Sequence, residues 1–72
     1  MNLTVTKNEL ALHTLRGIIQ ELGMDSSYNK RRIRKCLEFR YVHGEGKPVT
    51  QAEFDSVLDE EYKKVVDWRK AQ

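Results

Sequence analysis

The sequence has one cysteine, one proline and no long apolar run. A single cysteine cannot form an internal disulfide, and it is more typical of a reducing compartment than of a secreted, disulfide-bonded fold. Cys36, His13 and His43 do not have the spacing of a zinc motif, so we expect no metal site. A chain of 72 residues buries only about 60% of the surface that its unfolded form exposes. Additional stability would therefore have to come from another protein chain or a nucleic acid.

The short apolar stretches also exclude a membrane-spanning helix. The first ten residues lack a basic region followed by an apolar run, so we expect no signal peptide and a cytoplasmic location. Charged residues make up 33% of the chain and hydrophobic residues 39%, which is typical of a globular domain rather than a disordered segment. The length and the absence of a linker predict a single domain over residues 1–72.

Groups that could carry out catalysis are few. Neither histidine has a serine, cysteine or acid arranged as in a nucleophile system. Cys36 falls on an apolar stripe with Ile33 and Leu37, which predicts a buried and unreactive thiol. The loop over residues 43–47 has two glycines and a lysine, but it lacks the spacing and the preceding strand of a phosphate-binding loop. We therefore expect a protein that is not an enzyme and that needs no cofactor.

The first predicted helix covers residues 7–22. Thr6 and Glu9 match a capping box at its start. Apolar residues then recur at helical spacing: Ala11, Leu12, Leu15, Ile18, Ile19 and Leu22. Gly23 predicts a left-handed terminating residue, with Met24 making the apolar contact that accompanies such a cap.

Two further features lie in or near this helix. Leu3 and Val5 alternate with polar residues, which favours either a short N-terminal strand or a cover over the core. Gly17 costs about 1 kcal/mol against alanine inside a helix, so we interpret it as a point where another helix approaches closely.

A second helix is predicted to begin just after the turn and cap residues 25–27. Its apolar stripe consists of Ile33, Cys36, Leu37 and Tyr41. Residues 39–42 are rich in strand formers and lead into a flexible turn over residues 43–46. We favour a helix that continues to about His43, with a short hairpin across residues 39–49 as the alternative.

The third helix has the clearest start signal. Thr50 and Glu53 form a second capping box, and Val49 can pack on Phe54 as a hydrophobic staple. The apolar stripe that follows consists of Phe54, Val57, Leu58, Val65 and Trp68, with Tyr62 on its flank. Acids lie in the first turn and bases near Lys70, which suits the helix macrodipole. The whole pattern predicts an all-α, three-helix domain.

Charge is distributed in three blocks, although the net charge is only +2. Residues 25–47 hold seven bases and three acids, residues 48–62 hold five acids and no base, and residues 63–72 hold four bases and one acid. The basic middle block and the acidic block after it are the strongest functional signals in the sequence.

The basic block gives the leading functional hypothesis, in which the second helix of a small regulatory protein binds DNA or RNA. Cations at this density neutralise phosphates, and an exposed aromatic side chain can stack on an unpaired base. Helical spacing places Arg31, Arg32 and Lys35 outward, with Phe39 beside them. The candidate nucleic-acid-binding residues are Lys30, Arg31, Arg32, Arg34, Lys35, Phe39 and Arg40.

The same block also has a purely structural interpretation. The cations can cover an outer helix face while acids of the third helix balance them. Those acids are Asp55, Asp59, Glu60 and Glu61. The modest net charge also counts against tight, nonspecific DNA binding.

The alternative function is a protein-binding adaptor or inhibitor that uses the apolar and acidic surface of the third helix. Its candidate residues are Glu61, Val66 and Trp68. Glu61 projects toward the middle of the apolar stripe; we expect a surface glutamate there, with pairing to Arg40 or coverage by a partner as alternatives. Val66 lies off the stripe, as does Leu10 on the first helix, and such apolar surface favours a homodimer.

Overall fold

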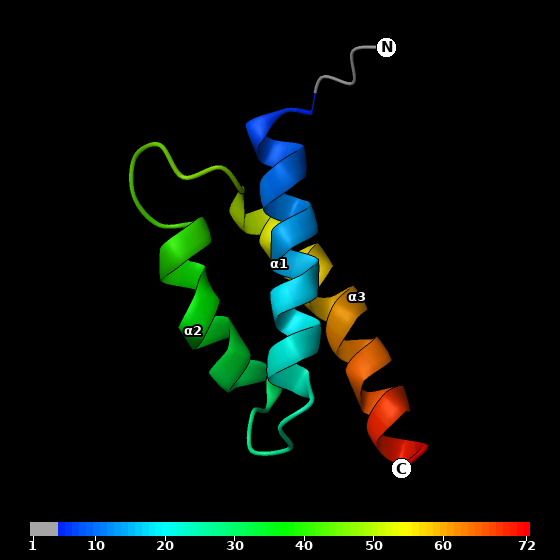
Figure 1. Cartoon of the computed structure of the whole chain (residues 1–72). Helices are drawn as coiled ribbons and strands as arrows, with labels where there is room; N and C mark the ends of the chain where they lie inside the picture. The colour runs from blue at the N-terminus through cyan, green and yellow to red at the C-terminus, as the bar shows by residue number, and fades with distance from the viewer. Residues whose placement is uncertain (1–4) are drawn as a thin grey trace.

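The computed structural model describes residues 5–72, which form three helices. Helix α1 spans Lys7–Gly23, α2 spans Lys30–Tyr41 and α3 spans Gln51–Lys70. α1 and α3 run in the same general direction and cross each other, whereas α2 runs in the opposite direction at one side of the pair (Figure 1). Most contacts between helices join α1 to α3. The predicted all-α, three-helix fold is confirmed.

The alternatives that contained strands are wrong for the described residues, because none of residues 5–72 belongs to a strand. α2 ends at Tyr41, two residues earlier than predicted, and a loop leads from there to α3. Gly44 and Gly46 have φ values of 100° and 79° in this loop, a region that favours glycine. Val5 is exposed and precedes α1, while Leu3 lies outside the described residues.

Side chains cap the start of each helix. Thr6 Oγ1 accepts a hydrogen bond from the Glu9 N–H at 3.0 Å. At α3 both halves of the capping box form, with the Glu53 N–H donating to Thr50 Oγ1 and the Thr50 N–H donating back to the Glu53 carboxylate. The cap of α2 is Asn29, whose side chain accepts the Arg32 N–H at 2.8 Å, so this helix begins later than the serines suggested.

The two glycines of α1 have roles opposite to those predicted. Gly23 is the last helical residue rather than a left-handed terminator, and Met24 after it is 65% exposed instead of making an apolar contact. A Cβ atom at Gly23 would lie 2.4 Å from a methyl carbon of Val65, so this glycine is where α1 and α3 approach closely. At Gly17 a Cβ atom would meet nothing within 4 Å.

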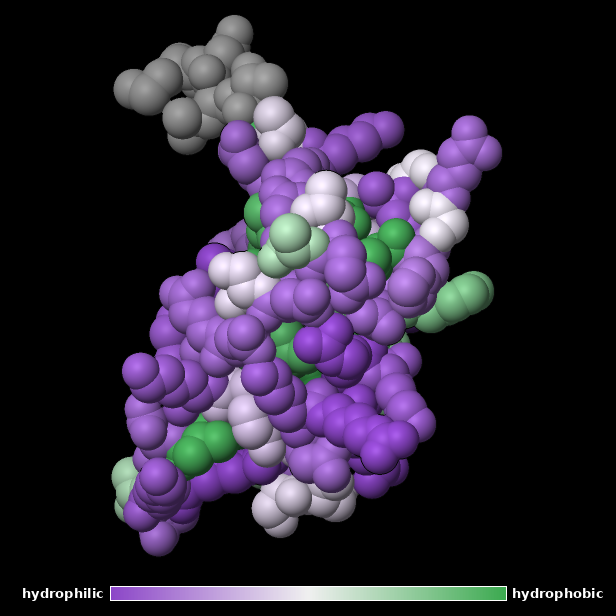
Figure 2. All heavy atoms as spheres, turned by 180° about the vertical axis from the view of Figure 1, so that it is seen from behind, coloured by the Kyte–Doolittle hydropathy of each residue, from purple (hydrophilic) through white to green (hydrophobic). Residues whose placement is uncertain are grey.

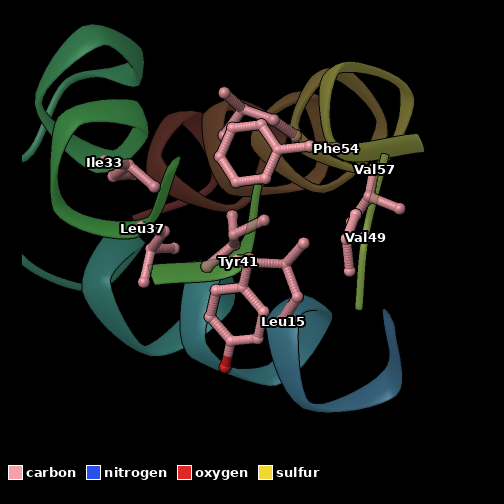
Figure 3. Packing of buried hydrophobic residues seen from close by; sticks show 9 residues of the cluster. Leu15, Ile33, Leu37, Tyr41, Val49, Phe54 and Val57 are labelled. Atoms are coloured by element: carbon pink, nitrogen blue, oxygen red, sulfur yellow. The ribbon is translucent and has the colours of Figure 1, made fainter. Parts of the chain in front are cut away.

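The core lies between the three helices and is centred on Phe54, which is 0% exposed. Figure 3 shows Phe54 with its ring among side chains from α1, α2 and Val49 in the loop before α3. The cluster contains Leu15, Ile19, Ile33, Leu37, Tyr41, Val49, Phe54, Val57 and Leu58. In the predicted stripe of α3, Phe54, Val57, Leu58 and Val65 are confirmed as buried, as is the staple residue Val49, but Trp68 is exposed.

Cys36 is exposed, so the prediction of a buried thiol is wrong. The buried stripe of α2 consists of Ile33, Leu37 and Tyr41, which are spaced four residues apart. Because successive residues are about 100° apart around a helix, this spacing turns Cys36 away from the core.

The connection between α1 and α2 is held by Arg69 from the last turn of α3. The guanidinium donates to the carbonyl oxygens of Gly23 at 3.0 Å, Asp25 at 2.8 Å and Tyr28 at 2.9 Å. It also lies over the ring of Tyr62. A cation at the end of α1 is favourable for the helix dipole, and the contact with Gly23 satisfies a carbonyl that the helix end leaves unpaired.

Candidate functional site

The side of α2 that faces α3 carries paired charges. Arg34 Nη1 lies 2.6 Å from a carboxylate oxygen of Asp55 and 3.2 Å from one of Glu38, and Lys30 forms an ion pair with Asp59. The hydrogen bond from Arg34 is the main reason why the pKa of Asp55 lies below its ordinary value. Lys30 and Arg34, two of the seven candidate residues, are therefore paired with acids of α3, as the structural interpretation expects.

The outward side of α2 carries cations without such partners. Arg31, Arg32, Lys35 and Arg40 are all exposed, and none of them forms an ion pair within residues 5–72. Arg32 lies over the ring of Tyr28, 4.4 Å from its centroid, and keeps its charge exposed. These four cations are available to a ligand.

Phe39 stands among these cations and is 74% exposed. It points outward because Leu37 and Tyr41, on either side of it in the chain, face the core. Lys35 lies one turn earlier on α2, and the Lys47 ammonium lies 5.9 Å from the centroid of the Phe39 ring. A large apolar ring is thus held in solvent, with Lys47 near it and Lys35 one helical turn away.

Lys47 was not among the predicted site residues. It belongs to the loop between α2 and α3, where helical periodicity gives no information about direction. The loop brings it to Phe39, whereas Phe39 and its helical neighbours could be placed from their spacing alone. We call the resulting surface the α2 basic face, and it consists of Arg31, Arg32, Lys35, Phe39, Arg40 and Lys47.

Glu61, a candidate for partner binding, is 0% exposed and lies between α1 and α3. Its carboxylate accepts hydrogen bonds from Arg16 at 2.9 Å, from Lys64 at 3.2 Å and from the Gln20 amide. Burial alone would raise the pKa of Glu61, but these hydrogen bonds outweigh it and the pKa lies below its ordinary value. The expectation of a surface glutamate is wrong, and so is its alternative partner Arg40.

The other two partner-binding candidates lie on the second half of α3. Val66 is half-buried and Trp68 is 42% exposed. Trp68 lines an open groove between the later parts of α1 and α3, together with Gly17, Gln20, Glu21, Gly23, Met24, Lys64 and Val65. Figure 2 shows a largely hydrophilic surface on which apolar residues appear in small separate areas.

None of the helices in residues 5–72 is long and apolar enough to cross a membrane. Comparison of the chain with protein-family models, with curated proteins and with solved structures found no match.

Proposed function

We propose that this chain is a small, non-enzymatic regulatory protein that binds nucleic acid through the α2 basic face. The observation that carries the proposal is the contrast within one helix. Lys30 and Arg34 are neutralised by α3, whereas the cations around Phe39 have no ion-pair partners among the described residues. Cations of this kind neutralise phosphates and release the counterions that surround them.

The start of α2 supports the same function. α1 and α3 each carry a glutamate in the first turn, which suits the positive end of the helix dipole. α2 has no acid there and begins instead with Lys30, Arg31 and Arg32. Cations at this end cost about 0.3–1 kcal/mol each, and a bound phosphate would offset that cost.

The test is a titration of the protein with labelled oligonucleotides at several salt concentrations. Affinity should fall linearly with salt on a log–log scale, with a slope of about −0.9 for each phosphate contacted on duplex DNA. The double variant Arg31→Glu, Arg32→Glu should lose this binding. Acids are favourable at a helix start, so the variant should stay folded.

A matched control changes the same amount of charge elsewhere. Lys63 and Lys70 are exposed on α3 and form no ion pair within residues 5–72. The double variant Lys63→Glu, Lys70→Glu should therefore bind much better than the α2 variant. Equal losses would mean that net charge alone drives binding. No salt-dependent binding by the unaltered protein up to about 100 μM, the weak end of nonspecific affinities, would reject the proposal.

The second candidate function is protein binding through α3, as an adaptor or inhibitor. The acidic surface of α3 gives this function little support, because Glu61 is buried and Asp55 and Asp59 are paired with α2. Its apolar half is supported by the groove beside Trp68, and the occupant that we propose is a second copy of this chain.

Charges of opposite sign support self-association at this groove. Glu21 and Lys64 both line it, so two copies related by a twofold axis can pair each with the other. The test is molar mass by light scattering over a range of concentrations. The mass should rise toward that of a dimer, and Gly17→Leu, which adds bulk to the groove, should prevent the rise. A mass that stays at 8.5 kDa throughout would reject the homodimer.

A further inference from the structure

We infer that the α2 basic face binds a single strand of nucleic acid in preference to a duplex, with an unpaired base stacked on Phe39. This inference rests on the proposed function and narrows its ligand. It depends on three observations: the free cations lie on only part of α2, acids flank them, and the central residue of the face is an aromatic ring.

The flank of α2 next to α3 is unfavourable for a second phosphate chain. Its cations Lys30 and Arg34 are already paired, and the carboxylates of Asp55 and Asp59 stay substantially exposed beside them. A helix in the major groove has a phosphate chain on each side. One of the two chains of a duplex would therefore face paired charges and find no free cation there.

Two of the four free cations, Arg32 and Lys35, form one band with Phe39, and Arg31 and Arg40 lie on either side of it. At about 100° per residue, Arg32, Lys35 and Phe39 fall within about 60° of one another around α2, on the side away from the core. Lys47 extends the band at the end of the helix where the loop begins. A band of cations on one side suits one backbone, which it can follow along the helix.

The ring of Phe39 indicates whether the bases of the bound nucleic acid are paired or unpaired. A phenylalanine has no group that could hydrogen-bond to a base edge, so it adds little to reading a duplex beyond contact with a thymine methyl. An unpaired base, in contrast, offers its whole face for stacking. The exposed ring at the centre of the α2 basic face therefore contributes most to binding when the bases are unpaired.

The experiment compares single-stranded DNA, single-stranded RNA and a DNA duplex with the same number of phosphates, by fluorescence anisotropy at one fixed salt concentration. Both single strands should bind more tightly than the duplex. Phe39→Ala should weaken single-strand binding about fivefold or more and duplex binding less than twofold. Phe39→Trp should recover the single-strand binding lost in Phe39→Ala, and Val5→Ala, which removes an exposed apolar side chain outside α2, should change none of the affinities.

Cys36 provides a second readout because it is exposed and lies three residues before Phe39 on α2. Bound single strands should slow its reaction with a thiol reagent. Duplex binding that is as tight as single-strand binding and equally sensitive to Phe39→Ala would overturn the inference while leaving the proposed function intact. The absence of salt-dependent binding to any of the three ligands would overturn both.

Discussion

The junction between α1 and α3 and the outward face of α2 both contain charged side chains, and they use them in opposite ways. At the junction, Glu61 is buried and accepts hydrogen bonds from three side chains. On α2, the cations around Phe39 stay in solvent without ion-pair partners among the described residues. The comparison teaches that partners and burial, more than residue type, decide whether a charge holds the fold or remains available. Substitutions at the junction or in the core should therefore change stability, and those on the α2 basic face should not.

The two phenylalanines give the largest expected contrast. Phe54→Ala should lower the free energy of unfolding by about 3 kcal/mol, because it empties the centre of the core. Phe39→Ala should change it by less than about 0.5 kcal/mol, because the ring lies in solvent. Urea denaturation measures both. Similar midpoints for the two variants would mean that the assignment of inside and outside is wrong.

Substituting the two glycines of α1 by alanine should change the stability of the protein in opposite directions. Gly23→Ala should cost about 2 kcal/mol, because the added methyl group collides with Val65 and forces α1 and α3 apart. Gly17→Ala should instead stabilise the protein by about 0.5–1 kcal/mol, because the space is open and alanine favours the helix. Thermal unfolding of the pair gives the comparison. A loss of stability at Gly17 would contradict it.

Glu61 makes the stability of the junction between α1 and α3 depend on pH. Its pKa in the folded protein lies below the ordinary value of 4.5, so the stability that it contributes is present above that pH and is lost as the pH falls below it. Glu61→Gln should cost about 1.5 kcal/mol at neutral pH, where hydrogen bonds to a charged group are lost. It should also reduce the loss of stability in acid.

The control for Glu61 is its neighbour Glu60, which also pairs with Arg16 but is largely exposed. Glu60→Gln should leave both the neutral stability and the acid dependence nearly unchanged. Denaturant unfolding between neutral and acidic pH tests the two variants. If they behave alike, burial of Glu61 does not set its role.

The smallest effect concerns Cys36, whose modification should leave the fold intact. Because the side chain is exposed on α2, a thiol reagent should label it at nearly the same rate in the native protein and in denaturant. Mass spectrometry after timed quenching measures both rates. Strong protection in the native state, without any ligand, would mean that Cys36 is buried and that the basic face of α2 points inward.

Features that depend on residues close together in the sequence were predicted better than those that depend on residues far apart in it. The starts of α1 and α3 depend on residues three apart, and Thr6 and Thr50 were enough to find them. The exposure of Phe39 followed from spacing along one helix. Cys36 was misplaced because it falls next to Ile33 on the helix surface, although the spacing of Ile33, Leu37 and Tyr41 already turns it away from the core.

Features that depend on two helices were not predictable from periodicity. Glu61 is buried because Arg16 and Gln20 lie opposite it, and they are 45 and 41 residues away in the chain. The crossing point of α1 and α3 likewise decides that Gly23, and not Gly17, is the close contact. The pairing of Arg34 with Asp55 also needed the position of α3, so the free cations of α2 could not be separated from the paired ones.

The contacts of Arg69 have a consequence for the order in which the protein is made. The carbonyls that it binds belong to residues 41 to 46 positions earlier in the chain. Synthesis proceeds from the N-terminus, so α1, α2 and the loop between them exist well before the side chain that fixes that loop. Until then water has to satisfy the carbonyls of Gly23 and Tyr28, whereas that of Asp25 already accepts the Tyr28 N–H. The final geometry therefore arises late, when the last turn of α3 docks, and all three helices reach it together.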